Sequence, residues 1–350
     1  MAMSDSWKSN WWLLFVGFVW YSSNTLSAIS TKNVLSANSD WTAIIFLTCL
    51  QFVCGGLLAL CQGYYMKDSP FHHNVFANVN QKHLIGGVCH MIGSMLTNLG
   101  YCFLSASLTQ VLKAGEPIFT VGLSAMVYGT SFTLDIYLSV FYCSMGLALF
   151  SCSDASFNLQ GFVVTMMSNT AIPLRNIICS DTLSGSGSVS GSVLIQADSH
   201  VKAVKLSSHN SFFLSSLIAF VVILPVMILL LPSQVGAGAA VWSSFSFVTA
   251  SLNAAMLHAT YNLASYQFLG ITGPITHTIA NVCKRVFIVM IAMYFYNESI
   301  AADKALSLFV LFVGVSLYLY CTKTKLPVDK TVHAAVIALV LLLIYANMRR

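Results

Sequence analysis

The stretch ANVCKRVFIVMIAMYF, residues 280–295, decides how this chain folds, because it is apolar enough to lie in a lipid bilayer and yet carries charge. Lys284 and Arg285 stand side by side in it, with apolar residues extending on both sides. A permanent cation inside a bilayer costs at least ~2.5–3.5 kcal/mol on insertion scales. The stretch therefore predicts a membrane-spanning helix whose two cations serve a function.

The composition of the whole chain is typical of a polytopic membrane protein. Of its 350 residues, 57% are hydrophobic and 8% are charged, whereas a soluble domain carries roughly a quarter charged residues. The ten cysteines all fall in apolar segments, without a C-x-x-C pair or a His/Cys cluster of zinc-ligand spacing. We therefore expect neither a metal nor a cofactor, and no disulfide is required.

Apolar runs of roughly 20 residues bounded by polar turns predict an all-α protein of ten transmembrane helices. We place them at 10–33, 41–63, 83–105, 106–129, 132–153, 157–181, 209–232, 245–269, 273–295 and 304–322. The first nine residues, MAMSDSWKS, are too short for a signal or transit peptide. We expect either a targeting segment outside this sequence or a first helix that acts as the signal.

The Ser/Gly-rich polar segment 183–208 predicts a division into two halves. Residues 1–182 hold the first five-helix repeat and the start of the second (spans 1–6), and residues 209–322 hold spans 7–10. Residues 323–350 form a basic linker and a short apolar C-terminal helix. The sequence leaves open whether this last helix crosses the bilayer, lies at its surface or packs on a partner.

The distribution of lysines supports this topology. Ten spans place most loop lysines on the side of the N-terminus and few on the other, which predicts a cytoplasmic-like N-terminus. The N-terminal side receives Lys8, Lys67, Lys82, Lys202, Lys205, Lys323, Lys325 and Lys330, and the opposite side Lys304 and, at the end of span 1, Lys32.

A weak internal repeat indicates how the halves are related. Residues 101–104 (YCFL), followed by Thr109, are similar to residues 266–269 (YQFL), followed by Thr276. Five spans per half make the second copy inverted relative to the first, a common plan in transporters. The same shift aligns Lys113 with Ala280, one helical turn before Lys284.

Four cations remain inside the predicted spans, namely Lys113, Arg175, Lys284 and Arg285. Together they cost roughly 10 kcal/mol, and one acid of comparable depth, Glu116, neutralises one at most. The excess charge must face water or an anion. Lysine and arginine together are a usual pairing around a phosphate group. For Lys32 we leave open that it extends to the headgroups instead.

These residues also carry a family resemblance. The chain resembles plastid phosphate translocators of the triose-phosphate/phosphate type, within the drug/metabolite transporter superfamily. The likeness runs from about residue 15 to 322. It is most specific in span 4, LKAGEPIF (112–119), and in span 9, GPITHTIANVCKR (273–285), with further matches at TKNVL (31–35), HMIG (90–93), SN (168–169) and YN (261–262).

The resemblance implies a strict antiporter that exchanges a phosphorylated three- to six-carbon metabolite for inorganic phosphate. It implies that Lys113, Lys284 and Arg285 hold the phosphate, and that Thr97 and Tyr261 contact the phosphate or the rest of the substrate. Ser94 stands where relatives tend to carry a larger polar residue, which leaves the metabolite open. Among supporting residues we include Arg175 and Glu116, together with His90, which either lines the cavity or bonds to another helix.

The resemblance also bears on partners and location. We expect a lipid bilayer around the protein, no nucleic acid, and a monomer or weak homodimer. A plastid envelope or the outer membrane of a complex plastid fits the family, and the ER–Golgi system remains open. The nearest alternative function is a nucleotide-sugar transporter of the same superfamily. An anion channel is disfavoured because a dense cationic site retains ions, and no nucleophile–base arrangement indicates an enzyme.

Overall fold

In the computed structural model, the described residues are 2–66, 76, 79, 81–129, 131–184, 207–234, 244–298 and 301–348, and their regular secondary structure is helical. The predicted polar segment 183–208 lies almost wholly outside them. The helices are α1 (Ala2–Ala37), α2 (Trp41–Tyr65), α3 (Gln81–Phe103), α4 (Ala106–Lys113), α5 (Glu116–Tyr128), α6 (Leu134–Ser153), α7 (Leu159–Ser184), α8 (Ser208–Gln234), α10 (Phe245–Phe295), α11 (Ala302–Thr324) and α12 (Lys330–Met348).

Five of these helices are long and apolar enough to cross a membrane, within the described part of the chain. They contain the segments Trp11–Ala37, Trp41–Tyr65, Leu134–Ser153, Ser208–Leu229 and Ala302–Thr324. Of the other long helices, α3, α7 and α10 hold buried polar and basic side chains, including His90, Asn169 and Lys284. Their lower hydropathy has a structural cause, because these side chains face the interior of the bundle rather than lipid.

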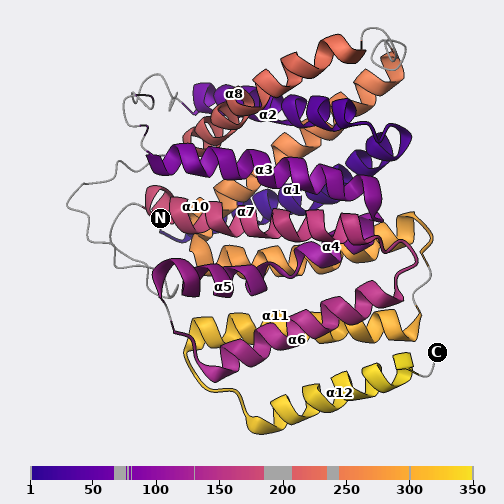
Figure 1. Cartoon of the computed structure of the whole chain (residues 1–350). Coiled ribbons are helices and arrows are strands. Elements are labelled where there is room, and N and C mark those ends of the chain that lie inside the picture. The colour runs from indigo at the N-terminus through magenta and orange to yellow at the C-terminus, as the bar shows by residue number, and fades with distance from the viewer. Residues whose placement is uncertain are drawn as a thin grey trace.

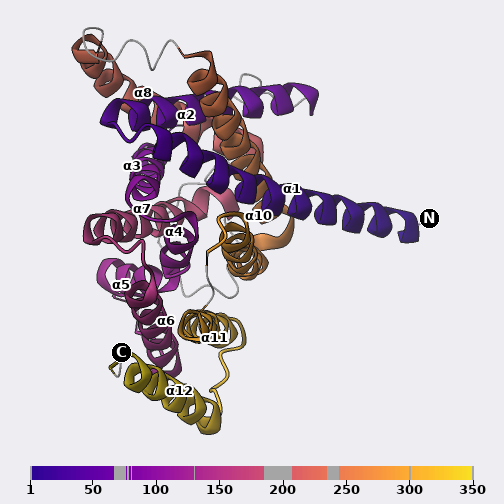
Figure 2. The ribbon, with the colours of Figure 1, turned by 90° about the vertical axis from the view of Figure 1, so that its right-hand side faces the viewer.

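The helices form a stack (Figure 1). At one end α2 packs against α8, and in the middle α1 packs along α10 and α3 along α7. At the other end α6 packs against α11, and α12 contacts both. The N-terminal part of α1 extends away from the bundle (Figure 2).

Helix α10 bends back on itself, although its helical assignment is continuous. Ser265 Oγ lies 2.9 Å from His277 Nε2, whereas residues twelve apart in a straight helix are separated by about 18 Å. The stretch GITGP (270–274) accounts for the bend. Proline lacks the backbone N–H that donates to the preceding turn of a helix, and a proline inside a helix is sterically incompatible with that turn. The predicted spans 245–269 and 273–295 are therefore the two arms of one bent helix, which we call its first and second arms.

The predicted span 106–129 is also interrupted. Helix α4 ends at Lys113 and α5 begins at Glu116, with Pro117 in its first turn. Proline suits that position since the first turn leaves its N–H groups unpaired anyway. The break, at Ala114 and Gly115, lies between Lys113 and Glu116, which the predicted span placed on one continuous helix.

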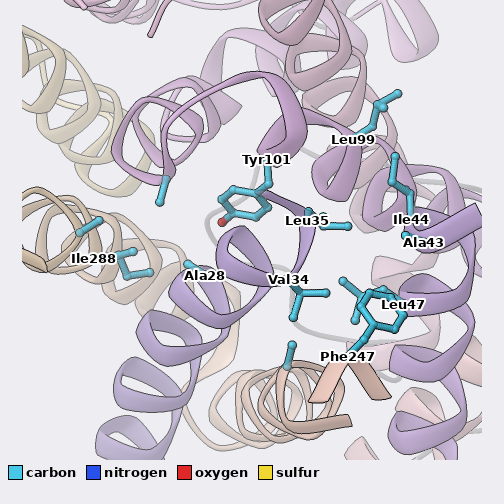
Figure 3. Packing of buried hydrophobic residues seen from close by; sticks show 13 residues of the cluster. Ala28, Val34, Leu35, Ala43, Ile44, Leu47, Leu99, Tyr101, Phe247 and Ile288 are labelled. Carbon is cyan, nitrogen blue, oxygen red and sulfur yellow. The ribbon is translucent and has the colours of Figure 1, made fainter. Parts of the chain in front are cut away.

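A buried apolar cluster joins α1, α2, α3 and α10 (Figure 3). Leu35 of α1 and Leu47 of α2 are fully buried there, and Ile288 comes from the second arm of α10. Tyr101 of α3 belongs to the same cluster. It brings a hydroxyl group into an otherwise apolar region, close to the polar interior described below.

Helix α12 has defined contacts with the bundle. The Asp329 carboxylate accepts a hydrogen bond from the Thr331 backbone N–H at 2.9 Å, which caps the helix and lowers the pKa of Asp329. Further along, His333 lies 3.1 Å from Asp135 and 3.0 Å from the Tyr142 hydroxyl, both on α6. The C-terminal helix is thus attached to α6 by a polar triad.

Helices α6 and α11 cross at contact distance because glycines lie in their interface. A Cβ atom at Gly314 would come within 2.6 Å of the Cys143 backbone nitrogen and 2.9 Å of the Ser139 carbonyl. Those atoms belong to helix backbone and cannot turn aside. The glycine therefore sets the distance between α6 and α11.

We expect Gly314→Ala to destabilise the protein by about 1–3 kcal/mol, since the added methyl group overpacks a helix crossing. The measurement is the melting temperature in detergent micelles. Gly122→Ala is the matched control, because nothing lies within 4 Å of a Cβ atom at that helical glycine. It should raise stability by about 0.5–1 kcal/mol, and equal behaviour of the two variants would contradict the close crossing.

Candidate functional site

A cavity of about 820 Å³ lies in the middle of the bundle, within the size range of small-molecule sites. It is lined by residues of α1, α2, α3, α4, α5, α7, α8 and both arms of α10. All nine predicted site residues line it, namely Lys113, Lys284, Arg285, Thr97, Tyr261, Ser94, His90, Arg175 and Glu116. Four permanently basic side chains and one carboxylate are among its described lining residues.

Lys113 ends α4 and points its ammonium group at two hydroxyls. Its Nζ donates to Thr97 Oγ1 and to Ser168 Oγ, each at 2.9 Å. Both hydroxyls donate their own protons to the carbonyl of Gly93, at 2.6 and 2.9 Å, so their lone pairs are available to the lysine. These neutral acceptors solvate the charge of Lys113 without cancelling it.

Arg285 is the cation that Glu116 neutralises. The guanidinium donates to Glu116 Oε2 at 3.3 Å and to Gln110 Oε1 at 3.3 Å. Gln110 in turn donates to the Tyr101 hydroxyl at 2.5 Å. The guanidinium group of Arg285 is thus held in one orientation by Gln110 of α4 and Glu116 of α5.

Lys284 lies on the other side of the second arm, toward α1. It is 5% exposed, and its Nζ lies 4.6 Å from the centre of the Trp20 ring and 6.0 Å from that of Tyr261. In the described part of the structure no hydrogen-bond acceptor or carboxylate pairs with it. The second arm therefore presents its two adjacent cations from opposite flanks, one tethered and one held by aromatic faces.

Arg175 forms a second level of the cavity. Its Nη1 lies 2.9 Å from His90 Nδ1, and its guanidinium lies 6.0 Å from the centre of the Tyr266 ring. Arg175 lies seven residues after Ser168 on α7, and His90 lies seven residues before Thr97 on α3. The two helices are antiparallel. Seven residues correspond to about 10 Å, so this level lies about 10 Å from Lys113.

The cavity is closed at one end by polar contacts between helices. Lys32 Nζ donates to the carbonyls of Tyr101 and Leu104, each at 2.7 Å. These carbonyls end α3, where helical partners are missing and a cation is favourable. Beside them the Ser107 hydroxyl donates to Glu298. Lys32 thus closes the helix bundle rather than extending to lipid headgroups.

At its other end the cavity reaches the last turn of α2 and the first turns of α3 and α8, where Met66, His83 and Ser208 line it. The two ends therefore differ. Near one end, hydrogen bonds join α1 to the end of α3 and join α4 to Glu298, which follows α10. The other end leads to the ends of helices on the side of the predicted basic loops.

Three side chains that contact the basic groups of the candidate site were not predicted as site residues: Ser168, Gln110 and Trp20. Ser168 stands two helical turns before Arg175, and Gln110 one turn before Lys113, so helical spacing was a usable signal for both. For Trp20 the sequence held no such signal, because its contacts come from α10.

Comparison with known proteins identifies the family of this chain. The model of the Triose-phosphate Transporter family matches residues 12–319. The chain belongs to this family. It is therefore an integral membrane transporter and not an enzyme, as the resemblance implied.

Individual relatives carry related names. The chain is similar to the triose phosphate/phosphate translocator of non-green plastids from Brassica oleracea var. botrytis, with 30% identity over 91% of this chain and 74% of the relative. It is 28% identical to phosphoenolpyruvate/phosphate translocator 2 of Arabidopsis thaliana, over 86% of this chain and 74% of the relative. A solved crystal structure, 11% identical, aligns with a TM-score of 0.54 over 87% of this chain and 95% of its own, which shows a shared fold.

We expect Lys32→Met to lower the melting temperature in detergent micelles. The change removes two charge-assisted hydrogen bonds at the end of α3, each worth about 1.5–3 kcal/mol. Lys323→Met, at an exposed position near the end of α11, is the control and should melt like the unaltered protein. If both variants melt alike, Lys32 does not hold the closed end together.

Proposed function

We propose that this protein is an antiporter that exchanges a phosphorylated three- to six-carbon metabolite for inorganic phosphate across a plastid envelope membrane. Lys113, Lys284 and Arg285 hold the phosphoryl group in this scheme. Thr97 and Tyr261 support it, and His90, Ser94 and Arg175 face the rest of the metabolite. The names of the relatives, which pair triose phosphate or phosphoenolpyruvate with phosphate, support this cargo class.

The main support is that the three basic groups line one cavity with a single carboxylate among its described lining residues. Two of these groups are solvated by neutral partners, and a buried charge without a counterion is costly. A phosphomonoester is mostly a dianion at neutral pH, because its second pKa is near ~6. Such a cargo supplies the missing negative charge, whereas a neutral sugar does not.

We also propose that the helices form two inverted five-helix repeats. The packing supports this, because it keeps its pattern when the halves are exchanged. When the halves are exchanged, the contact of α1 with α10 corresponds to the contact of α7 with α3 and α5. In the same way, the contact of α2 with α10 corresponds to the contact of α8 with α3. The pairs α2 with α8, α6 with α11, and α4 with α10 exchange into themselves. The cavity then lies at the interface of the repeats, where transporters of this plan bind cargo.

In this scheme transport proceeds by alternating access around the fixed cations. The sealed end at Lys32 and the opposite end open in turn. Closing both ends around empty cations is costly at low dielectric, and bound phosphate removes that cost. The carrier therefore crosses between its two states only when loaded, which couples the two fluxes as exchange.

We expect phosphate uptake by reconstituted vesicles only when their interior is preloaded with phosphate or a phosphorylated metabolite. Lys113→Ala and Lys284→Ala should each abolish the exchange, because each removes a cation from the phosphoryl site. Lys323→Ala, at an exposed position, should leave it unchanged. The measurement is uptake of labelled phosphate into liposomes with and without internal phosphate.

Two results would contradict this function. Rapid uptake into unloaded vesicles would exclude obligatory exchange. Competition by UDP- or GDP-sugars, without competition by triose phosphate, 3-phosphoglycerate or phosphoenolpyruvate, would replace the proposed cargo with nucleotide sugars.

Ser94 should influence the choice of metabolite. It lies on α3 between Thr97 and His90, and therefore between the two levels of the cavity. We expect Ser94→Asn to change the order in which triose, C3-acid, pentose and hexose phosphates compete, with less than about a threefold change in phosphate–phosphate exchange. An unchanged order of competition would place the metabolite elsewhere.

A further inference from the structure

Trp20 of α1 occupies a position that the proposed roles leave unexplained. Its side chain is 1% exposed and is the largest of the fully buried side chains. Its ring stacks on that of His277 at 4.7 Å between centroids and 14° between planes. Its ring centre also lies 4.6 Å from Lys284 Nζ. An indole thus borders the cavity directly beside the Lys284 ammonium.

The spacing of the two partners shows how the ring is held. His277 and Lys284 are seven residues apart on the second arm of α10, a rise of about 10 Å. The two contact distances together span nearly that rise. The indole therefore contacts two side chains that stand two helical turns apart on α10, the stacked ring of His277 and the ammonium of Lys284. Phe268 of the first arm also packs against the Trp20 ring, with 5.2 Å between the two ring centroids.

Other interior lysines have a different kind of partner. Lys113 has two hydroxyls, Lys32 has two carbonyls, and Lys304 has the Asp154 carboxylate at 2.8 Å. Within the described residues, Lys284 has the aromatic faces of Trp20 and Tyr261. A cation–π contact is an electrostatic attraction between the ammonium and the face of the ring. It holds an ammonium in place yet leaves its three protons for an incoming acceptor.

We propose that Trp20 is a positioning residue, whose indole holds the Lys284 ammonium at the edge of the empty cavity and yields it to the phosphoryl group of the cargo. This inference rests on the proposed function. A carboxylate in the place of Trp20 would compete with the cargo for Lys284. An aliphatic side chain would leave the ammonium with the more distant Tyr261 ring, 6.0 Å away, as its described partner.

The contact also links cargo to helix packing. Trp20 lies on α1, and the next residue, Tyr21, donates its hydroxyl to the Ala280 carbonyl of α10 at 2.6 Å. When phosphate draws Lys284 away from the indole, one contact between α1 and the second arm of α10 is weakened. Binding at the cavity is thereby transmitted to the helix pair that also carries Lys32.

The first experiment is a substitution series in the full-length reconstituted protein, with inorganic phosphate as the probe. Trp20→Phe keeps an aromatic face, and we expect the KM of phosphate–phosphate exchange to rise less than about threefold. Trp20→Leu removes the face, and we expect a rise of at least tenfold. Trp41→Leu, outside the cavity lining, is the control for loss of an indole and should change KM less than twofold.

The second experiment reads the contact directly. In a variant whose other five tryptophans are replaced by phenylalanine, the emission of Trp20 should change on titration with phosphate. Its half-saturation should equal that of phosphate binding measured by calorimetry on the same variant. A merely structural tryptophan would show no such change. This measurement also applies if Trp20→Leu fails to fold.

The outcomes separate the two proposals. If phosphate binds and exchanges while Trp20 emission stays constant and Trp20→Leu keeps its KM, the positioning role is wrong and the proposed function stands. If the unaltered protein neither binds nor exchanges phosphate, the proposed function itself fails. A saturable emission change together with a graded rise in KM supports the positioning role.

Discussion

Positive charge without a counterion, held in a low-dielectric interior, is the constraint on which the rest of this structure depends. Among the described contacts, Lys113 and Lys284 have partners that solvate the charge without neutralising it, whereas Arg285 lies beside Glu116. The Lys113 ammonium donates hydrogen bonds to two hydroxyl groups, and the Lys284 ammonium lies against two aromatic rings. Full neutralisation by internal carboxylates would give a more stable helix bundle, but it would leave no reason for an anion to bind.

Two irregularities of the backbone bring the basic side chains to the same cavity. The break between α4 and α5 ends one helix at Lys113 and starts the next at Glu116. The bend of α10 returns its second arm toward α1, so that two adjacent residues reach the cavity from opposite flanks. Non-helical backbone at membrane depth is tolerated where it is buried in protein or lines a cavity. Both irregularities satisfy this rule, because residues around each of them line the cavity.

The rest of the helix bundle holds the α4–α5 break and the bent helix α10 in place. Helices α6 and α11 cross closely at glycines and are among the helices apolar enough to face lipid. Of the helices that line the cavity, α3, α7 and α10 do not belong to the five apolar spans, because they carry buried polar and basic side chains. Lys32 joins α1 to the carbonyls at the end of α3.

The sequence by itself determined the class of protein, the helix spans to within a few residues, and the basic and polar side chains that line one cavity. It could do so because apolar length, helical spacing and the rarity of charge in a membrane are local properties of the chain. Only the tertiary structure decided the partners. Glu116 pairs with Arg285 rather than with its neighbour Lys113, Lys32 caps α3, and Trp20 lies against Lys284. Those contacts join residues up to 264 positions apart, and their geometry depends on how helices cross and bend, which no local pattern of residues records.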